Sequence, residues 1–313
     1  MSSIFSEDNF YMFALIAKHG NLSKAAEELG LTASAVSYAI KKIENHLGMP
    51  LLIRTTRNVE LTEAGKYYCE KATAFLNEFQ SMERSLNNIS RGIEFRVNIC
   101  INTLLHTPRH TSYLLHLLKQ IFPSCQFNIS TEVYFGVWDA LLNKNMDIAI
   151  GAPGILVEGG GIDYIEIGEI RWCFVVPPHH PLADMPEPIP ESVLRTFPNA
   201  FIEDTAENIP KRVGWLLQGQ EAIKVTDWET KKAMQIRGTG IGFLPDTLVK
   251  NEITNGTVVE KKIKNPRQPS SMLLAIKHDL KGEVSQWIHN AFLENQVLWK
   301  HYSDLLHYDQ LPF

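Results

Sequence analysis

The sequence predicts an all-α N-terminal part that contains a winged helix-turn-helix and a long helix, followed by a two-lobed α/β C-terminal part. Through the first ninety residues, apolar side chains recur at helical spacings of three and four. From residue 93 onward, apolar runs of strand length alternate with amphipathic stretches. A chain of 313 residues is long enough for separate cores. We therefore expect domains at 1–64, 65–92 and 93–313.

Two helices are predicted in the first thirty residues. Phe10 and Phe13 begin an apolar stripe that ends at Gly20, a residue that commonly terminates helices. Ser23 is the expected N-cap of a second, short helix, and Gly30 follows its last residue. The tight connection between the two helices is the first half of a helix-turn-helix pattern.

A third helix follows, with Thr32 as its expected N-cap. Val36, Ile40 and Ile43 form its buried stripe. The opposite face carries hydrogen-bond donors and one cation at the spacing i, i+3, i+4 and i+7: Ser34, Ser37, Tyr38 and Lys41. Such a helix is typical of one that enters the major groove of DNA by its N-terminal half.

A β-wing is predicted after this helix. The short apolar runs 51–53 and 59–61 are expected strands, and the turn between them holds Arg54, Thr55 and Arg57. Cations at a wing tip are suited to phosphates or to the minor groove. Although the net charge of the chain is −5, residues 32–58 carry four cations and one anion, so the positive charge is concentrated there. The candidate DNA-binding residues are Ser23, Thr32, Ser34, Ser37, Tyr38, Lys41, Arg54, Thr55 and Arg57.

Residues 65–92 predict a long helix that pairs with a second copy of the chain. Its apolar residues follow at alternating steps of four and three, which is a heptad seam. A homodimer would suit a helix-turn-helix that binds a two-fold site. The candidate dimerisation residues are Tyr68, Phe75, Phe79, Met82 and Leu86.

The C-terminal part predicts a parallel sheet with helical crossovers. Strands are expected at 95–101, 126–130 and 147–151, with helices at 111–121 and from 137. A second set of strands opens at 172–176 and ends at 240–245, and residues 272–276 return to the first lobe. The first lobe is expected at about 93–168 and 270–313, and the second at about 169–269.

Residues 10–65 resemble the DNA-binding domain of the LysR-type transcription regulators. The resemblance rests on fixed spacings that include Ala25-Ala26, Ser34-Ala35-Val36-Ser37, Pro50-Leu51-Leu52 and Ala64-Gly65. Two positions depart from the pattern: Asn21 stands where a serine is common, and Tyr38 where an arginine is frequent. The arginine–base contact is therefore not carried over to Tyr38.

The C-terminal part is similar to the periplasmic-binding-protein-like effector domain of the same family. The similar stretches are Asp147 to Gly151, His180-Pro181-Leu182 and Gly240 to Pro245. The resemblance implies a sequence-specific, DNA-binding regulator whose DNA binding or activation is controlled by a small polar metabolite. It further implies a homodimer or homotetramer, and RNA polymerase as a partner if the protein activates transcription.

The expected effector site lies beyond the carboxyl ends of the strands, between the lobes. Loops at that edge supply hydroxyls, carboxylates and aromatic rings, which suit a small hydrogen-bonding ligand. The candidate effector-binding residues are Asn102, Thr103, Thr131, Glu132, Tyr134, Phe135, Glu203, Asp204, Thr205 and Phe243.

A finer resemblance connects the chain to the LysR-type activators of allantoin utilisation. It rests on Phe135 to Asp139, Ile202-Glu203-Asp204, Lys211-Arg212-Val213 with Trp215, and Glu229-Thr230-Lys231. This resemblance implies a ureide or another purine-breakdown product as effector, with Glu203 and Asp204 as acceptors for its N–H groups.

Other classes of protein were weighed against this interpretation. The C-terminal part alone would suit a solute-binding protein, and the N-terminal part alone an architectural DNA-binding protein. For an enzyme or metal site, His106 and His110 are four residues apart, but Pro108 lies between them and no third ligand has a suitable spacing. The four cysteines include no C-x-x-C pair. We therefore predict no catalytic set, metal or cofactor. The first residues lack the pattern of a signal peptide and no apolar run spans a membrane, so a cytoplasmic location is expected.

Overall fold

The computed structural model describes residues 4–54, 58–155, 161–212, 214–280 and 282–308. The chain divides into two compact units, Met1–Asn87 and Asn88–Phe313. Within the described residues, no helix has both the length and the apolarity needed to cross a bilayer.

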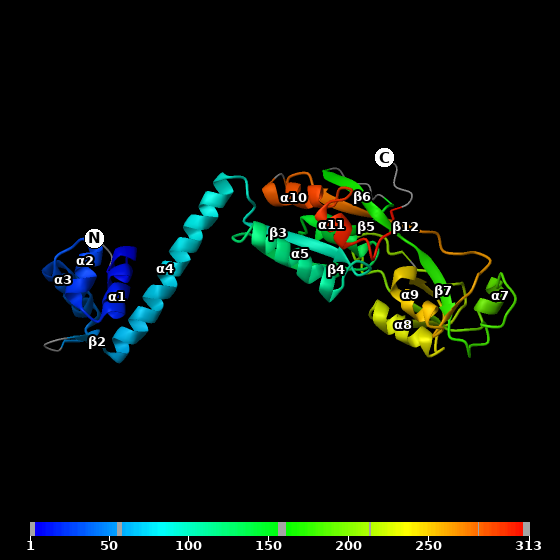
Figure 1. Ribbon diagram of the computed structural model, residues 1–313, viewed down its shortest axis with the longest axis horizontal. Coiled ribbons are helices and arrows are strands. Elements are labelled where there is room, and N and C mark those ends of the chain that lie inside the picture. The colour runs from blue at the N-terminus through cyan, green and yellow to red at the C-terminus, as the bar shows by residue number, and fades with distance from the viewer. Residues whose placement is uncertain (1–3, 55–57, 156–160, 213, 281, 309–313) are drawn as a thin grey trace. The chain divides into compact units, whose positions relative to one another are not determined.

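The first unit consists of three short helices, a two-stranded wing and most of a long helix (Figure 1). Phe13, Val36 and Ile40 are fully buried at its centre, because the apolar stripes of the first and third helices face each other. The elements are α1 (Glu7–His19), α2 (Leu22–Leu29), α3 (Ala33–Leu47), β1 (Leu52–Arg54), β2 (Val59–Leu61) and α4 (Glu63–Ser90).

The helix boundaries of this unit confirm most of the expected caps and correct one. Gly20 and Gly30 adopt the left-handed conformation that ends α1 and α2, and the Thr32 side chain caps α3. Ser23 is not the N-cap of α2. Asn21 takes that place, and its Oδ1 accepts hydrogen bonds from the amides of Ser23 (2.8 Å) and Lys24 (3.2 Å).

The wing is joined to the helices on both sides. β1 and β2 are antiparallel, with Leu52 opposite Leu61. The observed β1 begins and ends one residue later than expected, and Ile53 is half-exposed rather than buried. At the start of α4, a Cβ on Gly65 would lie 2.0 Å from the Leu51 carbonyl oxygen, so only glycine allows α4 to pack this closely against the wing.

The second unit begins with a five-stranded sheet in the order β4-β3-β5-β12-β6. β3 is parallel to β4 and β5, whereas β12 is antiparallel to β5 and β6. The observed β3, β4 and β5 confirm the predicted parallel strands. The elements around this sheet are β3 (Arg96–Asn102), α5 (Pro108–Ile121), β4 (Gln126–Glu132), α6 (Gly136–Asn143), β5 (Ile148–Pro153), β6 (Ile162–Ile170), β12 (Ser270–Lys277), α10 (Glu283–Ala291) and α11 (Val297–His301).

Both faces of this sheet are covered by helices. Ile99 and Ile101 point to the face packed by α5, α10 and α11, and Cys100 points to the face packed by α6. This alternation is the pattern expected for a sheet buried on both sides.

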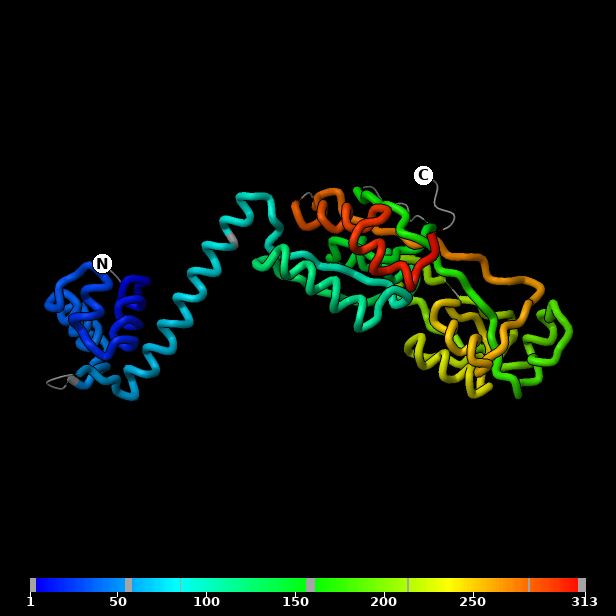
Figure 2. The backbone as a smooth tube through the Cα atoms, viewed as in Figure 1, coloured from blue at the N-terminus to red at the C-terminus, as the bar shows by residue number. Residues whose placement is uncertain are grey.

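The remaining elements form the second half of this unit. Its strands pair in the orders β10-β7-β11, antiparallel, and β8-β9, parallel. The chain enters this half by running from β6 into β7 and leaves it through the segment that leads into β12, as Figure 2 shows. The elements are β7 (Trp172–Val176), α7 (Glu191–Leu194), β8 (Asn199–Ile202), β9 (Ala222–Val225), α8 (Trp228–Ile236), β10 (Phe243–Pro245), α9 (Asp246–Thr254) and β11 (Val259–Glu260).

Candidate functional site

The first candidate surface is the exposed face of α3. Burial of Val36, Ile40 and Ile43 fixes the orientation of the helix, so the opposite face points away from the core. Tyr38 on that face is 74% exposed, and Lys41 one turn later is also exposed. The predicted spacing of donors therefore forms one accessible row, which can reach base edges and phosphates in a major groove.

The N-terminal end of α3 is ordered by its cap. Thr32 Oγ1 accepts a hydrogen bond from the Ala35 amide (3.2 Å) and lies 3.0 Å from Ser34 Oγ. Thr32 and Ser34 are exposed, and Ser37 is half-buried. Ser23 is exposed at the start of α2.

Glu44 connects α3 to the wing. Its Oε1 accepts hydrogen bonds from the amides of Leu51 (2.7 Å) and Leu52 (3.1 Å). The single anion of the 32–58 segment is thus engaged by backbone donors. Arg54 is the last residue of β1, and the predicted contacts Thr55 and Arg57 lie outside the described residues.

The predicted dimer seam is divided between two environments. Tyr68 and Ala72 are buried in the core of their own unit, where the Tyr68 ring contacts that of Phe13 at a centroid distance of 4.8 Å. Tyr68 therefore offers no exposed surface to a second chain, which corrects its assignment to the seam. Phe75, Met82 and Leu86, together with Ile89, are each more than half exposed, and Phe79 is partly buried.

The second candidate site is a cavity of about 510 Å³ in the second unit. It lies among the loop after β4, the end of β5, the segment around Arg212 and the start of β12, so both halves of the unit contribute to it. The volume suits a small metabolite. Side chains that line it and can bind or stack include Tyr134, Phe135, Arg212, Trp215, Arg267 and Ser270.

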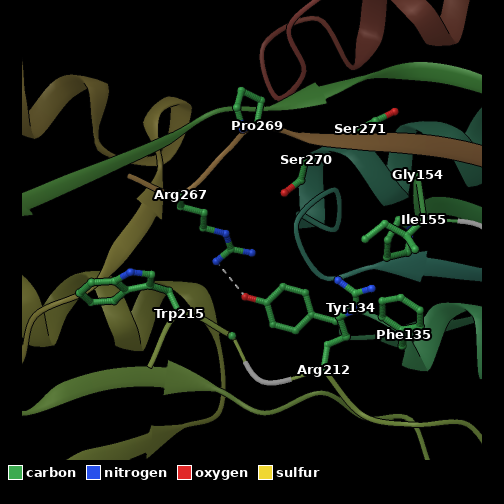
Figure 3. A pocket seen from close by; sticks show the side chains of 12 residues that line it. Tyr134, Phe135, Gly154, Ile155, Arg212, Trp215, Arg267, Pro269, Ser270 and Ser271 are labelled. Carbon is green, nitrogen blue, oxygen red and sulfur yellow. Dashed lines mark hydrogen bonds between the residues drawn. The ribbon is translucent and has the colours of Figure 1, made fainter. Parts of the chain in front are cut away.

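Two arginines, Arg212 and Arg267, line this cavity, and each lies over an aromatic ring. Arg267 Nη1 donates a hydrogen bond to Tyr134 Oη (3.2 Å), and Figure 3 shows these two side chains pointing toward each other. The Arg267 guanidinium carbon is also 3.4 Å from the centre of the Trp172 ring. The Arg212 guanidinium carbon lies 5.0 Å from the centre of the Phe135 ring. Among the described residues, no carboxylate is within ion-pair distance of either arginine, so the cavity carries uncompensated positive charge.

Of the ten predicted effector residues, the structure places Tyr134 and Phe135 on the cavity wall. Asn102 and Asp204 are buried and bond to the backbone instead. Asn102 Nδ2 donates to the Gly151 carbonyl oxygen (2.8 Å), and its Oδ1 accepts from the Leu104 amide. These contacts correct the expectation that both side chains face a ligand.

The Asp204 carboxylate joins three segments of backbone. Its oxygens accept hydrogen bonds from four amides: Phe135 (3.3 Å), Gly136 (3.0 Å), Ala206 (3.0 Å) and Arg212 (2.8 Å). Thr205 Oγ1 accepts in the same way from the Val133 amide (2.9 Å). These two residues hold the cavity wall in place without lining it.

The other predicted effector residues also have partners within the protein. Thr103 Oγ1 accepts from Trp228 Nε1 (3.2 Å), and Glu132 pairs with Lys144 (3.2 Å). The remaining three lie away from the cavity wall: Thr131 is exposed within β4, Glu203 pairs with Lys211 and Lys224, and Phe243 is buried against Phe174 and Trp215. The rule of strand ends predicted an edge of the sheet at which a cavity lies, but most of the predicted loop residues do not line that cavity.

Sequence reasoning missed the residues that precede and begin β12. Arg267, Pro269, Ser270 and Ser271 line the cavity, because the chain returns to the first sheet directly beside it. The available signal was positional: Arg267 lies just before residues 272–276, which were expected to return to the first lobe.

Comparisons with known proteins show which family each part of the chain resembles. Residues 8–66 match the family model described as "Bacterial regulatory helix-turn-helix protein, lysR family". Residues 94–296 match the model of the LysR substrate binding domain. Together the two models span α1 to α3, the wing and the start of α4, and most of the second unit.

Two relatives are HTH-type transcription regulators, and a solved structure shares the fold. The chain is 41% identical over 247 residues to the HTH-type transcriptional activator AllS of Klebsiella pneumoniae, which covers 79% of this chain and 92% of that relative. It is 30% identical over 297 residues to the HTH-type transcriptional regulator PunR of Escherichia coli K12, with 95% and 96% covered. A mutant of Corynebacterium glutamicum OxyR shares the fold, with a TM-score of 0.62, 17% identity and coverage of 96% and 94%. The chain therefore belongs to the LysR family of DNA-binding transcription regulators, which are not enzymes.

Proposed function

We propose that this regulator binds a two-fold operator as a homodimer or homotetramer and is switched by a small polar effector in the cavity around Arg267. One observation carries this proposal: a donor-rich, exposed helix face and a positively charged cavity occur in separate compact units of one chain. The effector is a ureide or a related purine-breakdown compound. The protein acts in the cytoplasm as an activator that contacts RNA polymerase.

Binding to DNA depends on α3 and the wing. Lys41 reaches a phosphate, and Tyr38 contacts a base edge or a phosphate by its hydroxyl. The exposed residues of α4 place two copies of α3 on one face of the duplex, as a two-fold site requires.

The effector acts by binding one arrangement of the second unit better than another. The cavity is lined from both halves of this unit, so a ligand that contacts Tyr134 and Trp215 together favours the arrangement in which both can reach it. When the ligand shifts the second unit toward that arrangement, the dimer binds DNA with a different half-site spacing and bend.

The DNA-binding part of the proposal is tested by measuring how binding depends on salt concentration. The DNA is the intergenic segment beside the gene that encodes this regulator. Lys41→Ala should lower affinity and reduce the slope of log K against log salt by about one, because one fewer phosphate is neutralised. Lys250→Ala, an exposed lysine of the second unit, is the matched control and should leave the slope unchanged. An unaltered slope in Lys41→Ala would remove this lysine from the contacts.

The effector part is tested by thermal unfolding with a panel of ureides. A ligand present at a hundred times its dissociation constant stabilises the folded protein by about 2.7 kcal/mol. A rise in melting temperature with one or more ureides is expected. If no ureide raises it while another polar metabolite does, the proposed effector class is wrong, although DNA binding is unaffected.

A further inference from the structure

A further cation lies buried on α8, separated from Arg267 by two indole rings. Lys231 is 5% exposed, and Gln235, one turn later, is fully buried. Both polar atoms of the Gln235 side chain lack a hydrogen-bond partner among the described residues. A Cβ on Gly242 would lie 3.3 Å from Gln235 Nε2 and 3.4 Å from Lys231 Cε, so the bare glycine leaves room for these two polar side chains.

Lys231 and Arg267 lie against two neighbouring indole rings that are tilted relative to each other. Lys231 Nζ is 5.4 Å from the centre of the Trp228 ring, and the Trp228 and Trp172 rings are 5.6 Å apart. Arg267 lies on Trp172 and lines the cavity. Cation–π contacts offset only part of the cost of desolvating a charge.

Lys231 and Arg267 are cations without an acidic partner in the part of the chain that the structure describes. Among the described residues, neither Lys231 nor Arg267 has a carboxylate within ion-pair distance. Burial, with the positive charge of Arg267 as second cause, lowers the pKa of Lys231 to about 7. Two such cations, next to an unpaired amide and a ligand cavity, are complementary to an anion.

We propose that the effector carries a carboxylate, which Arg267 binds and Lys231 neutralises, with Gln235 as a further hydrogen-bonding partner. This inference rests on the proposed function, since it assigns a charge to the ligand of the same cavity. Binding would then be coupled to a proton: the carboxylate favours the ammonium form of Lys231, so the amine takes up a proton from the buffer as the anion enters.

The test compares two ureides that differ by one ring opening: allantoate, a carboxylate, and allantoin, which is neutral. Calorimetric titrations of the full chain at pH 8, in HEPES and in Tris, report affinity and proton uptake together. Allantoate should bind at least tenfold more tightly than allantoin. Its apparent enthalpy should differ between the buffers, because the two buffers release a proton at different enthalpies.

Variants locate the effect. Lys231→Met should remove the buffer dependence and weaken allantoate at least tenfold, and Arg267→Gln should weaken allantoate by a similar factor. Lys250→Met, an exposed lysine, is the control and should alter neither quantity. Equal affinity for the two ureides, or allantoate binding that is unaffected in Lys231→Met, would overturn the inference while leaving a ureide-controlled regulator intact.

A minimal probe separates the inference from the choice of ureide. Formate carries only a carboxylate and formamide is its neutral counterpart. At equal ionic strength, formate should raise the melting temperature of the wild-type chain more than formamide does, and this difference should vanish in Lys231→Met. An equal response of both proteins to formate would refute the anion site whatever the ureides do. If neither ureide binds but formate gives the expected difference, the effector class fails and the anion site stands.

Discussion

Asp204 and Lys231 are both buried charged residues of the second unit, yet their surroundings are opposite. The Asp204 carboxylate receives four backbone N–H groups and closes a loop against the cavity wall. Lys231 Nζ donates no hydrogen bond to any of the described residues. A buried charge with a full set of partners stabilises the fold, whereas one without partners costs stability and suits a site that awaits a ligand.

At this residue scale, Asp204→Ala should destabilise the protein by roughly 3 kcal/mol or more, because four buried amides lose their acceptor. Glu203→Ala should lower the free energy of unfolding much less, because Glu203 is exposed and solvent screens its ion pairs with two lysines. Urea unfolding of the two variants measures the difference. Similar losses in both would show that the four hydrogen bonds contribute little.

The lowered pKa of Lys231 predicts a pH-dependent stability. The folded value is about 7 and the reference value is 10.5, so between these pH values the unfolded chain binds one more proton than the folded chain. The destabilising effect of Lys231 is therefore complete below pH 7 and fades toward pH 10.5. Relative to Lys231→Met, the wild-type free energy of unfolding should rise by up to about 1.4 kcal/mol per pH unit in this range. If the free energies of unfolding of the wild type and Lys231→Met differ by the same amount at pH 7, 8 and 9, the lowered pKa of Lys231 is contradicted.

At the scale of elements, α4 combines two roles along one apolar stripe. Its first turns place Tyr68 and Ala72 inside the helix-turn-helix core, and its later turns leave Met82 and Leu86 exposed. The heptad spacing is the same throughout. The sequence therefore predicts one continuous stripe, whereas its division into a buried and an exposed part depends on where the neighbouring helices end.

Met82→Glu and Leu86→Glu should weaken self-association at least tenfold, because each introduces a charge where two apolar surfaces are proposed to meet. The helix content should be unchanged, since both side chains are exposed in one chain. Sedimentation equilibrium measures the association. Glu83→Gln, on the same turns but off the seam, is the control. An association constant that is the same in all variants would place the interface elsewhere.

Local rules predicted elements better than they predicted caps and sites. Apolar runs located β3 and β5, which are buried on both faces, and the alternation of polar and apolar residues located the edge strand β4. The cap of α2 was assigned to Ser23 instead of Asn21, since both residue types accept amide hydrogen bonds and two residues separate them. The cavity residues around Arg267 were missed because their proximity to Tyr134 arises from the chain's return into β12, more than a hundred residues later.

At the scale of the whole molecule, the chain has two units with separate cores. Calorimetric unfolding should therefore show two transitions, since each core can be lost independently. An effector that binds the cavity should raise only the transition of the second unit, which holds every residue that lines it. A single transition that shifts as a whole with ligand would show that the two units unfold together.

The indole rings beside Arg267 and Lys231 have an optical consequence. The chain has six tryptophans, and three of them, Trp172, Trp215 and Trp228, lie at the cavity or under the cations next to it. Nearby positive charge shifts and quenches indole emission. An anion that pairs with Arg267 and Lys231 alters the electric field at the indole rings, so its entry should change the intrinsic fluorescence. The regulator thus carries its own reporter of effector binding, and an unlabelled titration followed at the emission maximum should give the affinity directly.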